Sequence, residues 1–250
     1  MAEHTKVEWC THTWNPWWGC AKVSAACRSC YAADIAKRWG HDVWGVNAPR
    51  RILSPSNWRE PLTWDRRAVR TGECPRVFCA SMADVFEDRR DLDQPRAWLW
   101  ELIERTPNLT WLLLTKRPGN ISWLVPQSWW RDGFPANVWM GTTVESQDHA
   151  WDRIGNLELV PSVVHFVSCE PLLGPVELPP YSVDWVIAGE ERGHGARPSD
   201  RNWFRQLRDQ CVAEGAAFFL KQFVEAKGLK KISLPELDGQ QWAQVPEVQQ

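Results

Sequence analysis

Short apolar runs recur along the chain, and each of them ends in polar side chains. The clearest runs cover residues 76–81, 111–115, 138–143, 163–168, 185–189 and 216–220, and a first, short strand is expected at 7–9, where Val7 and Trp9 flank Glu8. Continuous apolar runs of this length are typical of strands buried on both faces of a parallel sheet. Amphipathic stretches at 31–39, 94–105 and 201–214 predict helices between the runs, the last of them ending at Gly215.

Seven such strand units predict an α/β fold, a full or partial (β/α) TIM-type barrel that forms one domain over residues 1–250. An open doubly wound sheet is the alternative, but no glycine-rich fingerprint follows the first run. Residues 40–75 have no long period, so we expect a long excursion with a short helical piece at 61–70. The tail from Lys230 onward is expected to form a closing lip and then a frayed end.

Three cysteines in residues 15–31, the cysteine loop, form the most specific pattern in the sequence. Cys20, Cys27 and Cys30 follow the spacing C-x6-C-x2-C. Three thiolates on one loop can bind three irons of a 4Fe–4S cluster and leave the fourth iron open. A zinc site, with Cys10 or His12 as the fourth ligand, and a set of inert buried thiols are the two alternatives. The spacing alone does not decide between the three.

Polar side chains at the ends of the apolar runs are the other candidates for a site. In a (β/α) barrel the carboxyl ends of the strands surround one opening, where the active site lies. The cysteine loop follows the first run and would face the same opening. The predicted residues around it are Ser81, Asp84, Thr115, Lys116, Arg117, Thr143, Glu145, Ser168, Glu170, Glu190, Lys221 and Gln222. Each could also be an ordinary loop residue.

Composition and charge narrow the class of protein. The net charge of −2, with 44% hydrophobic and 24% charged residues, is ordinary for a globular chain and predicts no overall attraction to nucleic acid. No stretch has the length of a membrane span, and eight cysteines without a leader-like segment favour metal or redox chemistry in the cytoplasm. The nineteen tryptophans are expected to fill the core. The residues that could instead contact nucleic acid are Trp17, Trp18 and Trp44, with arginine pairs at 50–51, 66–67 and 89–90.

Several motifs together resemble a known family. They are TWNP at 13–16, the cysteine loop with Tyr31 and Ala32, DVF at 84–86, LLLTKRP at 112–118, SCEPLLGP at 168–175, LRDQC at 207–211, FLKQ at 219–222 and LDG at 237–239. The chain resembles the three-cysteine phage-protein family, found in phages and bacterial mobile elements. That family is similar to radical S-adenosylmethionine (SAM) enzymes of the spore-photoproduct-lyase-like branch.

The resemblance implies a partial TIM-type barrel that binds a 4Fe–4S cluster and S-adenosyl-L-methionine. Cys20, Cys27 and Cys30 would hold the cluster, and a 5′-deoxyadenosyl radical would take a hydrogen atom from the substrate. The first gap between cysteines is longer than the usual C-x3-C-x2-C, and Tyr31 is expected to pack over the adenine. The other residues expected to hold the cofactor are Ser81, Thr143, Glu145, Ser168 and Glu190.

The predicted function is modification or repair of a nucleic-acid base or a nucleotide, with an external electron donor and no membrane partner. Asp84, Arg117, Lys221 and Gln222 are the expected substrate contacts. Lys116 and Cys169 are the candidate catalytic residues, with Cys169 either a hydrogen-atom donor at a strand tip or a buried structural thiol. The alternative function is a non-catalytic nucleic-acid-binding protein stabilised by zinc or a cluster. A zinc hydrolase is disfavoured because the six histidines are scattered.

Overall fold

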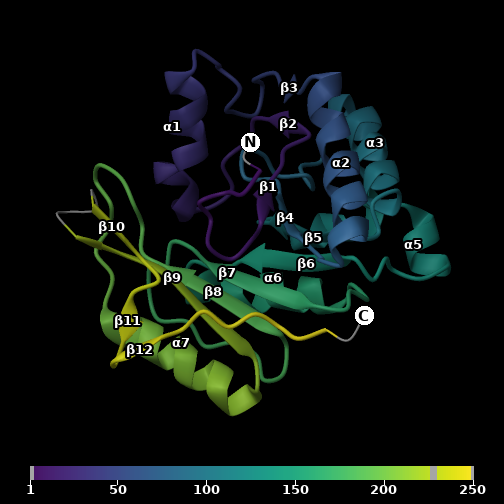
Figure 1. The fold of residues 1–250 in the computed structure, drawn as a ribbon. Coiled ribbons are helices and arrows are strands. Elements are labelled where there is room, and N and C mark those ends of the chain that lie inside the picture. Colours follow the sequence, from purple (N-terminus) through teal and green to yellow (C-terminus); the bar gives the residue numbers. More distant parts are fainter. Residues whose placement is uncertain (1–2, 226–229, 249–250) are drawn as a thin grey trace.

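A curved eight-stranded sheet organises the protein (Figure 1). The structure, a computed structural model, describes residues 3–225 and 230–248. The strand order is β1-β4-β5-β6-β7-β8-β9-β10, and all neighbouring pairs are parallel except β9 and β10. The strands are β1 (His12–Thr13), β4 (Arg76–Cys79), β5 (Thr110–Thr115), β6 (Val138–Thr143), β7 (His165–Cys169), β8 (Trp185–Gly189), β9 (Ala217–Glu225) and β10 (Lys230–Ser233).

The sheet is an open half-barrel, because β1 and β10 form its two edges instead of pairing with each other. The predicted α/β fold is therefore confirmed as a partial TIM-type barrel. Two short pairs lie outside the sheet. They are β2 (Trp17–Trp18) with β3 (Arg51–Ile52), and β11 (Glu236–Leu237) with β12 (Gln240–Gln241).

Helices cover the outer face of the sheet. Figure 1 shows α2, α3 and α5 grouped on one side, α7 on the other, and α1 apart from both. The α-helices are α1 (Tyr31–Arg38), α2 (Pro55–Thr71), α3 (Asp93–Glu104), α4 (Ile121–Leu124), α5 (Gln127–Arg131), α6 (Gln147–Glu158) and α7 (Arg201–Glu214). Short 3₁₀ segments are η1 (Ala25–Ser29), η2 (Arg90–Leu92) and η3 (Pro118–Asn120). The Asp200 side chain caps α7 by accepting from Asn202 N at 2.8 Å, and Gly215 ends it with φ of 74°.

The first strand lies later in the chain than the prediction at 7–9. β1 is His12–Thr13, whereas Trp9 is buried inside the half-barrel. Its ring centroid lies 4.6 Å from that of Phe78 and 6.1 Å from that of Trp185. The apolar character of residues 7–9 therefore reflects a side chain that closes the barrel floor, not a strand.

Two further segments differ from the prediction. The excursion at 40–75 contains α2, a helix of 17 residues that begins at Pro55 and carries the buried Trp64 and Ala68 against the core. Its pattern is hidden because Pro61 lies inside the helix and charged residues fill the exposed face. The tail adds β10 to the sheet edge and the β11–β12 hairpin, where a lip was expected. The predicted frayed end falls partly on 249–250, which lie outside the described residues.

The tryptophans mostly fill the core, as predicted. Those that are almost fully buried include Trp9, Trp14, Trp17, Trp111 and Trp185. Among the described residues, no helix has the length and apolar character needed to cross a membrane.

Candidate functional site

The cysteine loop begins after β2 and leads directly into α1. Cys20 follows the strand, Cys27 lies in η1, and Cys30 is the residue before the first turn of α1. All three thiols are free and partly exposed. Cys10, Cys79, Cys169 and Cys211 are also free but buried, and Cys74 is partly exposed. The loop cysteines are therefore the set that a metal or cofactor can reach together.

Arg117, just after β5, joins the loop to the sheet. Its Nη1 donates to Cys20 Sγ at 3.7 Å, and its Nη2 donates to the carbonyl oxygen of Ala21 at 2.8 Å. The same guanidinium is ion-paired with Asp84, with Nη1 2.7 Å from Oδ2. The hydrogen bonds of Arg117 are thus made within the protein in this conformation, and they fix the beginning of the cysteine loop.

Asp84 is itself held by the end of β5. Its Oδ1 accepts from Thr115 Oγ1 at 2.8 Å, and its Oδ2 accepts from Lys116 N at 3.2 Å. Phe86 N donates to Oδ1 at 3.0 Å. The predicted residues Asp84, Thr115 and Arg117 therefore form one connected network beneath Cys20.

Ser81 and Tyr31 lie on the same side of the opening. The Tyr31 hydroxyl donates to Ser81 O at 3.3 Å, and Asn15 Nδ2 donates to Ser81 Oγ at 3.1 Å. Asn15 also accepts from Met82 N at 2.7 Å. The Tyr31 residue remains 55% exposed, so its ring is accessible beside the cysteine loop.

Glu145, after β6, carries a buried charge near the middle of the loop. Its Oε2 accepts from Arg153 Nη1 at 2.7 Å, and Arg153 also donates to Thr143 O at 2.7 Å. Burial alone would raise the pKa of Glu145, but a hydrogen bond from Ser24, the charges of Arg153 and Lys116 and the Arg153 hydrogen bond together lower it. Its other oxygen, Oε1, is buried and lies 3.7 Å from His149 Nε2, and among the described residues no hydrogen bond of regular geometry reaches it.

Glu170 and Lys221 form an ion pair on the inner face. Lys221 Nζ lies 2.9 Å from Glu170 Oε1. Burial opposes the charge on Lys221, but the carboxylate of Glu170 outweighs it and raises the pKa of the amine. Ala188 pairs with Leu220 and Gly189 pairs with Gln222, so Lys221 is the extra residue of a β-bulge. A bulge turns one side chain away from the regular alternation, and bulges are frequent beside active sites.

Lys221 and Gln222 lie within β9, whereas the apolar run predicted a strand that ends at residue 220. Gln222 Nε2 donates to Glu190 O at 2.9 Å. Glu190 accepts from Ser199 Oγ and Val224 N at 2.6 Å each. Both carboxylate oxygens of Glu190 therefore have partners that join β8 and β9 to the following loop.

Cys169 lies on the opposite side of the sheet from the opening. It is fully buried in the outer apolar cluster that includes Val167, Leu207 and Cys211. Burial, with smaller effects from Cys211 and nearby carboxylates, raises its pKa well above the ordinary value. This burial favours the structural thiol over the hydrogen-atom donor, because alternate residues of β7 face opposite sides and Cys169 lies on the outer one. By the same alternation, Ser168 lies on the inner face and is buried there.

Arg50 and Arg89, which belong to two of the three predicted arginine pairs, are each bound by an acidic side chain. Arg50 is buried and binds Glu87 through two hydrogen bonds of 2.9 and 2.7 Å. Arg89 binds Asp91 in the same way at 2.9 and 2.7 Å. Trp17 is fully buried and cannot stack on a base, whereas Trp18 and Trp44 are only partly buried.

The thiols differ in how readily they ionise. Burial and the nearby Asp84 raise the pKa of Cys20 to about 12, although Arg117 opposes this. Burial also acts on Cys27, but backbone hydrogen bonds involving Val23 and Ser24 and the charge of Lys116 lower its pKa. A thiolate is the form that binds metal, and a bound cation favours it.

The three loop cysteines match an iron–sulfur cluster in the number and type of their donor atoms. Cys20, Cys27 and Cys30 supply three thiols on one segment at the carboxyl ends of the strands. Within the described residues, no three His, Cys, Asp or Glu side chains converge on one point as in an assembled metal site. Holding a cluster would therefore require the three thiols to turn toward one another on a loop whose backbone is already in place.

The site also contains residues that the sequence did not single out. Arg197, between β8 and α7, donates from Nη1 to Ala25 O at 3.2 Å, so it contacts the cysteine loop from the other half of the sheet. Its Nε and N both donate to Glu191 Oε2 at 2.8 Å. Neither residue belongs to an apolar run or a recognisable motif, so only the tertiary contact identifies them.

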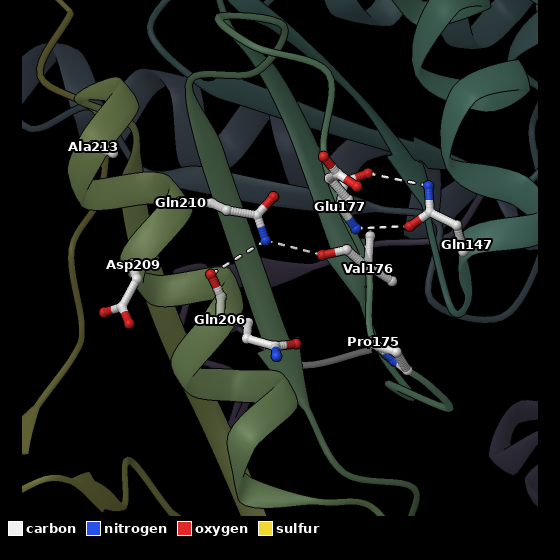
Figure 2. A pocket seen from close by; sticks show the side chains of 8 residues that line it. All are labelled: Gln147, Pro175, Val176, Glu177, Gln206, Asp209, Gln210 and Ala213. Carbon is white, nitrogen blue, oxygen red and sulfur yellow. Dashed lines mark hydrogen bonds between the residues drawn. The ribbon is translucent and has the colours of Figure 1, made fainter.

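A shallow groove of about 700 Å³ lies elsewhere, between α7 and residues 175–177 (Figure 2). Two of its polar side chains form hydrogen bonds with the backbone. Gln210 Nε2 donates to Val176 O at 2.9 Å, and Gln147 Oε1 accepts from Glu177 N at 2.7 Å. None of the candidate site residues lines it. The groove is therefore separate from the cysteine loop.

Comparisons with known proteins place the chain in a family. No curated protein was found to match the sequence. A spore photoproduct lyase mutant with bound AdoMet and dinucleoside spore photoproduct is similar in structure, with a TM-score of 0.48 and 12% identity over 87% of this chain. A second spore photoproduct lyase mutant gives a TM-score of 0.47 and 13% identity over 87% of this chain.

In both comparisons this chain spans 58% of the length of the lyase chain. The model of one family matches residues 4–246, nearly the whole sequence. The chain therefore belongs to the family described as "Protein of unknown function (DUF5131)".

Proposed function

We propose that this protein is an iron–sulfur enzyme of the radical SAM type that acts on a nucleic-acid base or a nucleotide. The observation that carries the proposal is the cysteine loop: three partly exposed thiols on one segment at the carboxyl ends of the strands. In barrel enzymes this is the end where chemistry takes place. The resemblance to the three-cysteine phage-protein family agrees with the proposal but stays a prediction.

Cys20, Cys27 and Cys30 would hold a 4Fe–4S cluster with one iron left open for S-adenosyl-L-methionine. When bound, these groups would use an electron from an external donor to cleave S-adenosyl-L-methionine and produce a 5′-deoxyadenosyl radical. Among the chain's own residues, Glu145 is the best placed to orient the cofactor. Its ionised and buried Oε1 can accept a hydrogen bond from an ammonium or hydroxyl group.

The remaining predicted residues have narrower roles. Tyr31 offers an exposed ring for stacking, and Ser81, Thr143 and Ser168 contribute polar atoms near the strand ends. Lys116 is free of the Asp84–Arg117 ion pair and could meet a phosphate or act in proton transfer. The other predicted residues would influence a ligand indirectly, because their side chains are bonded within the protein and position their neighbours. They are Asp84, Arg117, Glu190, Lys221 and Gln222.

A surface next to the cysteine loop supports a nucleic-acid partner. Trp39 is 70% exposed at the end of α1, and Arg51 lies 5.2 Å from the centroid of the Trp18 ring. Exposed basic residues on this surface are Lys22, Arg28, Lys37, Arg38 and Arg51, against the exposed acids Asp34 and Asp42. Aromatic rings among basic side chains are typical of surfaces that bind single-stranded nucleic acid.

The first experiment is anaerobic reconstitution with iron and sulfide, followed by a test for 5′-deoxyadenosine release with dithionite. Wild-type protein should bind iron and acid-labile sulfide, and Cys27→Ala should lose them. Cys74→Ala is the matched control, because Cys74 is also a free and partly exposed thiol. Full iron retention in Cys27→Ala would contradict the proposal, and binding of zinc alone would favour a non-catalytic protein.

A second experiment tests the partner. Binding of single-stranded DNA and RNA should weaken steeply as salt increases, since phosphate contacts release counterions. Trp39→Ala should reduce the affinity about tenfold, within the range for loss of one stacked base. Trp151→Ala, at a tryptophan on α6 that is 58% exposed, is the control and should have no effect. Equal affinities for both variants and wild type would argue against this surface.

A further inference from the structure

The cysteine loop is attached to the sheet at two points by arginines that come from opposite halves of the half-barrel. Arg117 follows β5 and contacts Ala21, whereas Arg197 follows β8 and contacts Ala25. We propose that Arg117 and Arg197 are positioning residues that hold the backbone of the loop across the opening. The inference deepens the proposed function and rests on it for its purpose, but the contacts belong to the metal-free chain.

The length of the loop between Ala21 and Ala25 is comparable with the distance between the strands that precede Arg117 and Arg197. In the sheet, β5 and β8 are separated by β6 and β7, which corresponds to three strand spacings or about 14 Å. The four residue steps from Ala21 to Ala25 span at most about 14 Å when fully extended. Residues 22–24, between the two contacts, form no helix or strand, and η1 begins only at Ala25. The long side chains of Arg117 and Arg197 therefore meet the loop at the two ends of this irregular stretch.

Each arginine is fixed by a carboxylate before it meets the loop. Asp84 holds Arg117, and Thr115 and the backbone of Lys116 hold Asp84. Glu191 is almost fully buried and binds Arg197 through both the side chain and the backbone nitrogen. The planar guanidinium offers donors in two directions, so one edge can bind a carboxylate while another binds a carbonyl. A lysine cannot do this with the same geometry.

The bonds to Ala21 and Ala25 are made to backbone oxygens, which leaves Cys27 and Cys30 free of both arginines. The arginines hold the backbone, while Cys27 Sγ makes a local contact with Ser24 Oγ at 3.8 Å within the loop itself. A backbone held in this way is needed if three separate thiols are to turn toward a common centre without refolding the loop. Cys20 differs, because Arg117 Nη1 also contacts its sulfur and would remain a hydrogen-bond donor to it.

Hydrogen–deuterium exchange of the metal-free protein tests the inference directly. Arg117→Gln and Arg197→Gln should each speed exchange in peptides covering residues 20–30 by about tenfold or more, because local opening sets the exchange rate. Exchange in β6 and α7 should stay unchanged. Arg205→Gln is the matched control, since Arg205 is also ion-paired, with Asp238 at 2.9 Å, but its hydrogen bonds and ion pairs among the described residues are with Asp238 and Asn202 and not with the loop.

Two further variants show whether faster exchange comes from the lost contact with the loop, from the lost positive charge or from general unfolding. Arg117→Lys keeps the positive charge but loses the planar guanidinium with its several donors. It should therefore speed exchange at residues 20–30 as much as Arg117→Gln does. Glu191→Gln leaves Arg197 in place but weakens its support, and a smaller increase in exchange is expected. Wild-type exchange rates at 20–30 in Arg117→Gln and Arg197→Gln would overturn the inference.

The outcome is independent of the proposed function. If the wild-type protein binds no iron, the proposed function fails, while the exchange result still shows whether the arginines hold the loop. If the protein binds iron, both arginine variants should also retain less of it than Arg205→Gln.

Discussion

The inner face of the half-barrel has two layers that come from the same strands but differ in chemistry. The lower layer is aromatic and almost dry, and consists of Trp9, Phe78, Leu112, Trp139, Phe166, Trp185 and Phe219. The upper layer, nearer the carboxyl ends, carries Lys116, Ser168, Glu170 and Lys221. On β9 the two layers are only two residues apart, at Phe219 and Lys221.

The lower part of each strand therefore contributes mainly to stability, whereas the upper part carries the polar and charged side chains. Aromatic rings in the lower layer contact one another, for example Trp139 and Trp185 with centroids 6.2 Å apart. They fix the curvature of the sheet and contribute mainly through buried area. Charged groups in the upper layer are costly to bury and contribute little net stability. The position of Lys221 is set by its ion pair with Glu170 rather than by apolar packing.

The largest expected effect is in the lower layer. Trp185→Ala should lower the free energy of unfolding by about 3–5 kcal/mol, because it removes a fully buried ring and leaves a cavity. Chemical denaturation measures the loss. A change below about 1 kcal/mol would show that the lower layer does not hold the sheet. Trp151→Ala, at an exposed ring, is the control.

A substitution at Gly141 tests the packing of the lower layer by adding atoms to it, whereas Trp185→Ala removes them. A Cβ at Gly141 would lie 2.4 Å from the Phe166 ring, which is closer than any tolerated contact. Gly141→Ala should therefore cost about 1–3 kcal/mol in the free energy of unfolding, the usual range for overpacking a core. A second substitution, Phe166→Leu, should recover part of the loss. No destabilisation in the single variant would mean that the ring moves freely.

Lys221 tests the upper layer. Lys221→Met should destabilise the protein by about 1–3 kcal/mol, because it leaves the largely buried carboxylate of Glu170 without its partner. Lys221→Met combined with Glu170→Gln should be close to wild type, and a double-mutant cycle measures the coupling between the two residues. A double variant as unstable as the single one would contradict a purely electrostatic pair.

The same pair predicts a pH dependence. The pKa of Lys221 is raised above its ordinary value of 10.5 in the folded protein. Its contribution to stability is therefore fully present below pH 10.5 and is lost as the pH rises through the higher folded-state pKa. Lys221→Met should show less loss of stability than wild type over this alkaline range, and equal pH profiles would argue against the pair.

The smallest effect is expected at Gly189, the counterpart of Gly141 in the upper layer. A Cβ there would lie 2.8 Å from Glu170 Oε1 and 3.2 Å from Gln222 Cγ, which belong to flexible side chains, although a shift of Glu170 disturbs its ion pair with Lys221. Gly189→Ala should therefore lower the free energy of unfolding by about 1 kcal/mol, the usual size for a single substitution. A loss as large as that of Gly141→Ala would show that both layers are equally rigid.

Much of the fold could be predicted because buried parallel strands leave long apolar runs. The runs at 138–143 and 185–189 coincide with β6 and β8, and the helix predicted at 201–214 coincides with α7. α2 was predicted too short, since its apolar positions are few and Pro61 interrupts the pattern. The apolar residues near Trp9 predicted a strand, although that side chain fills the barrel floor.

The candidate site was predictable only at the level of segments. Polar residues at the strand ends suggested Asp84, Thr115 and Arg117, and the structure brings them together. The sequence did not show which face of the sheet Cys169 occupies. An error of one residue in the position of β7 exchanges its inner and outer faces. The bulge at Lys221 likewise lets Leu220 and Phe223 both reach the outer cluster while Lys221 faces inward.

The sequence by itself determined the parallel strands, most of the helices and the group of three cysteines, because these depend on local patterns of apolar residues and on spacing. Only the tertiary structure decided which arginines hold the cysteine loop. Ala21 and Arg117 are 96 residues apart, and Ala25 and Arg197 are 172 apart. Contacts across such separations depend on how the curved sheet brings its strand ends together, and no local pattern in the sequence records that arrangement.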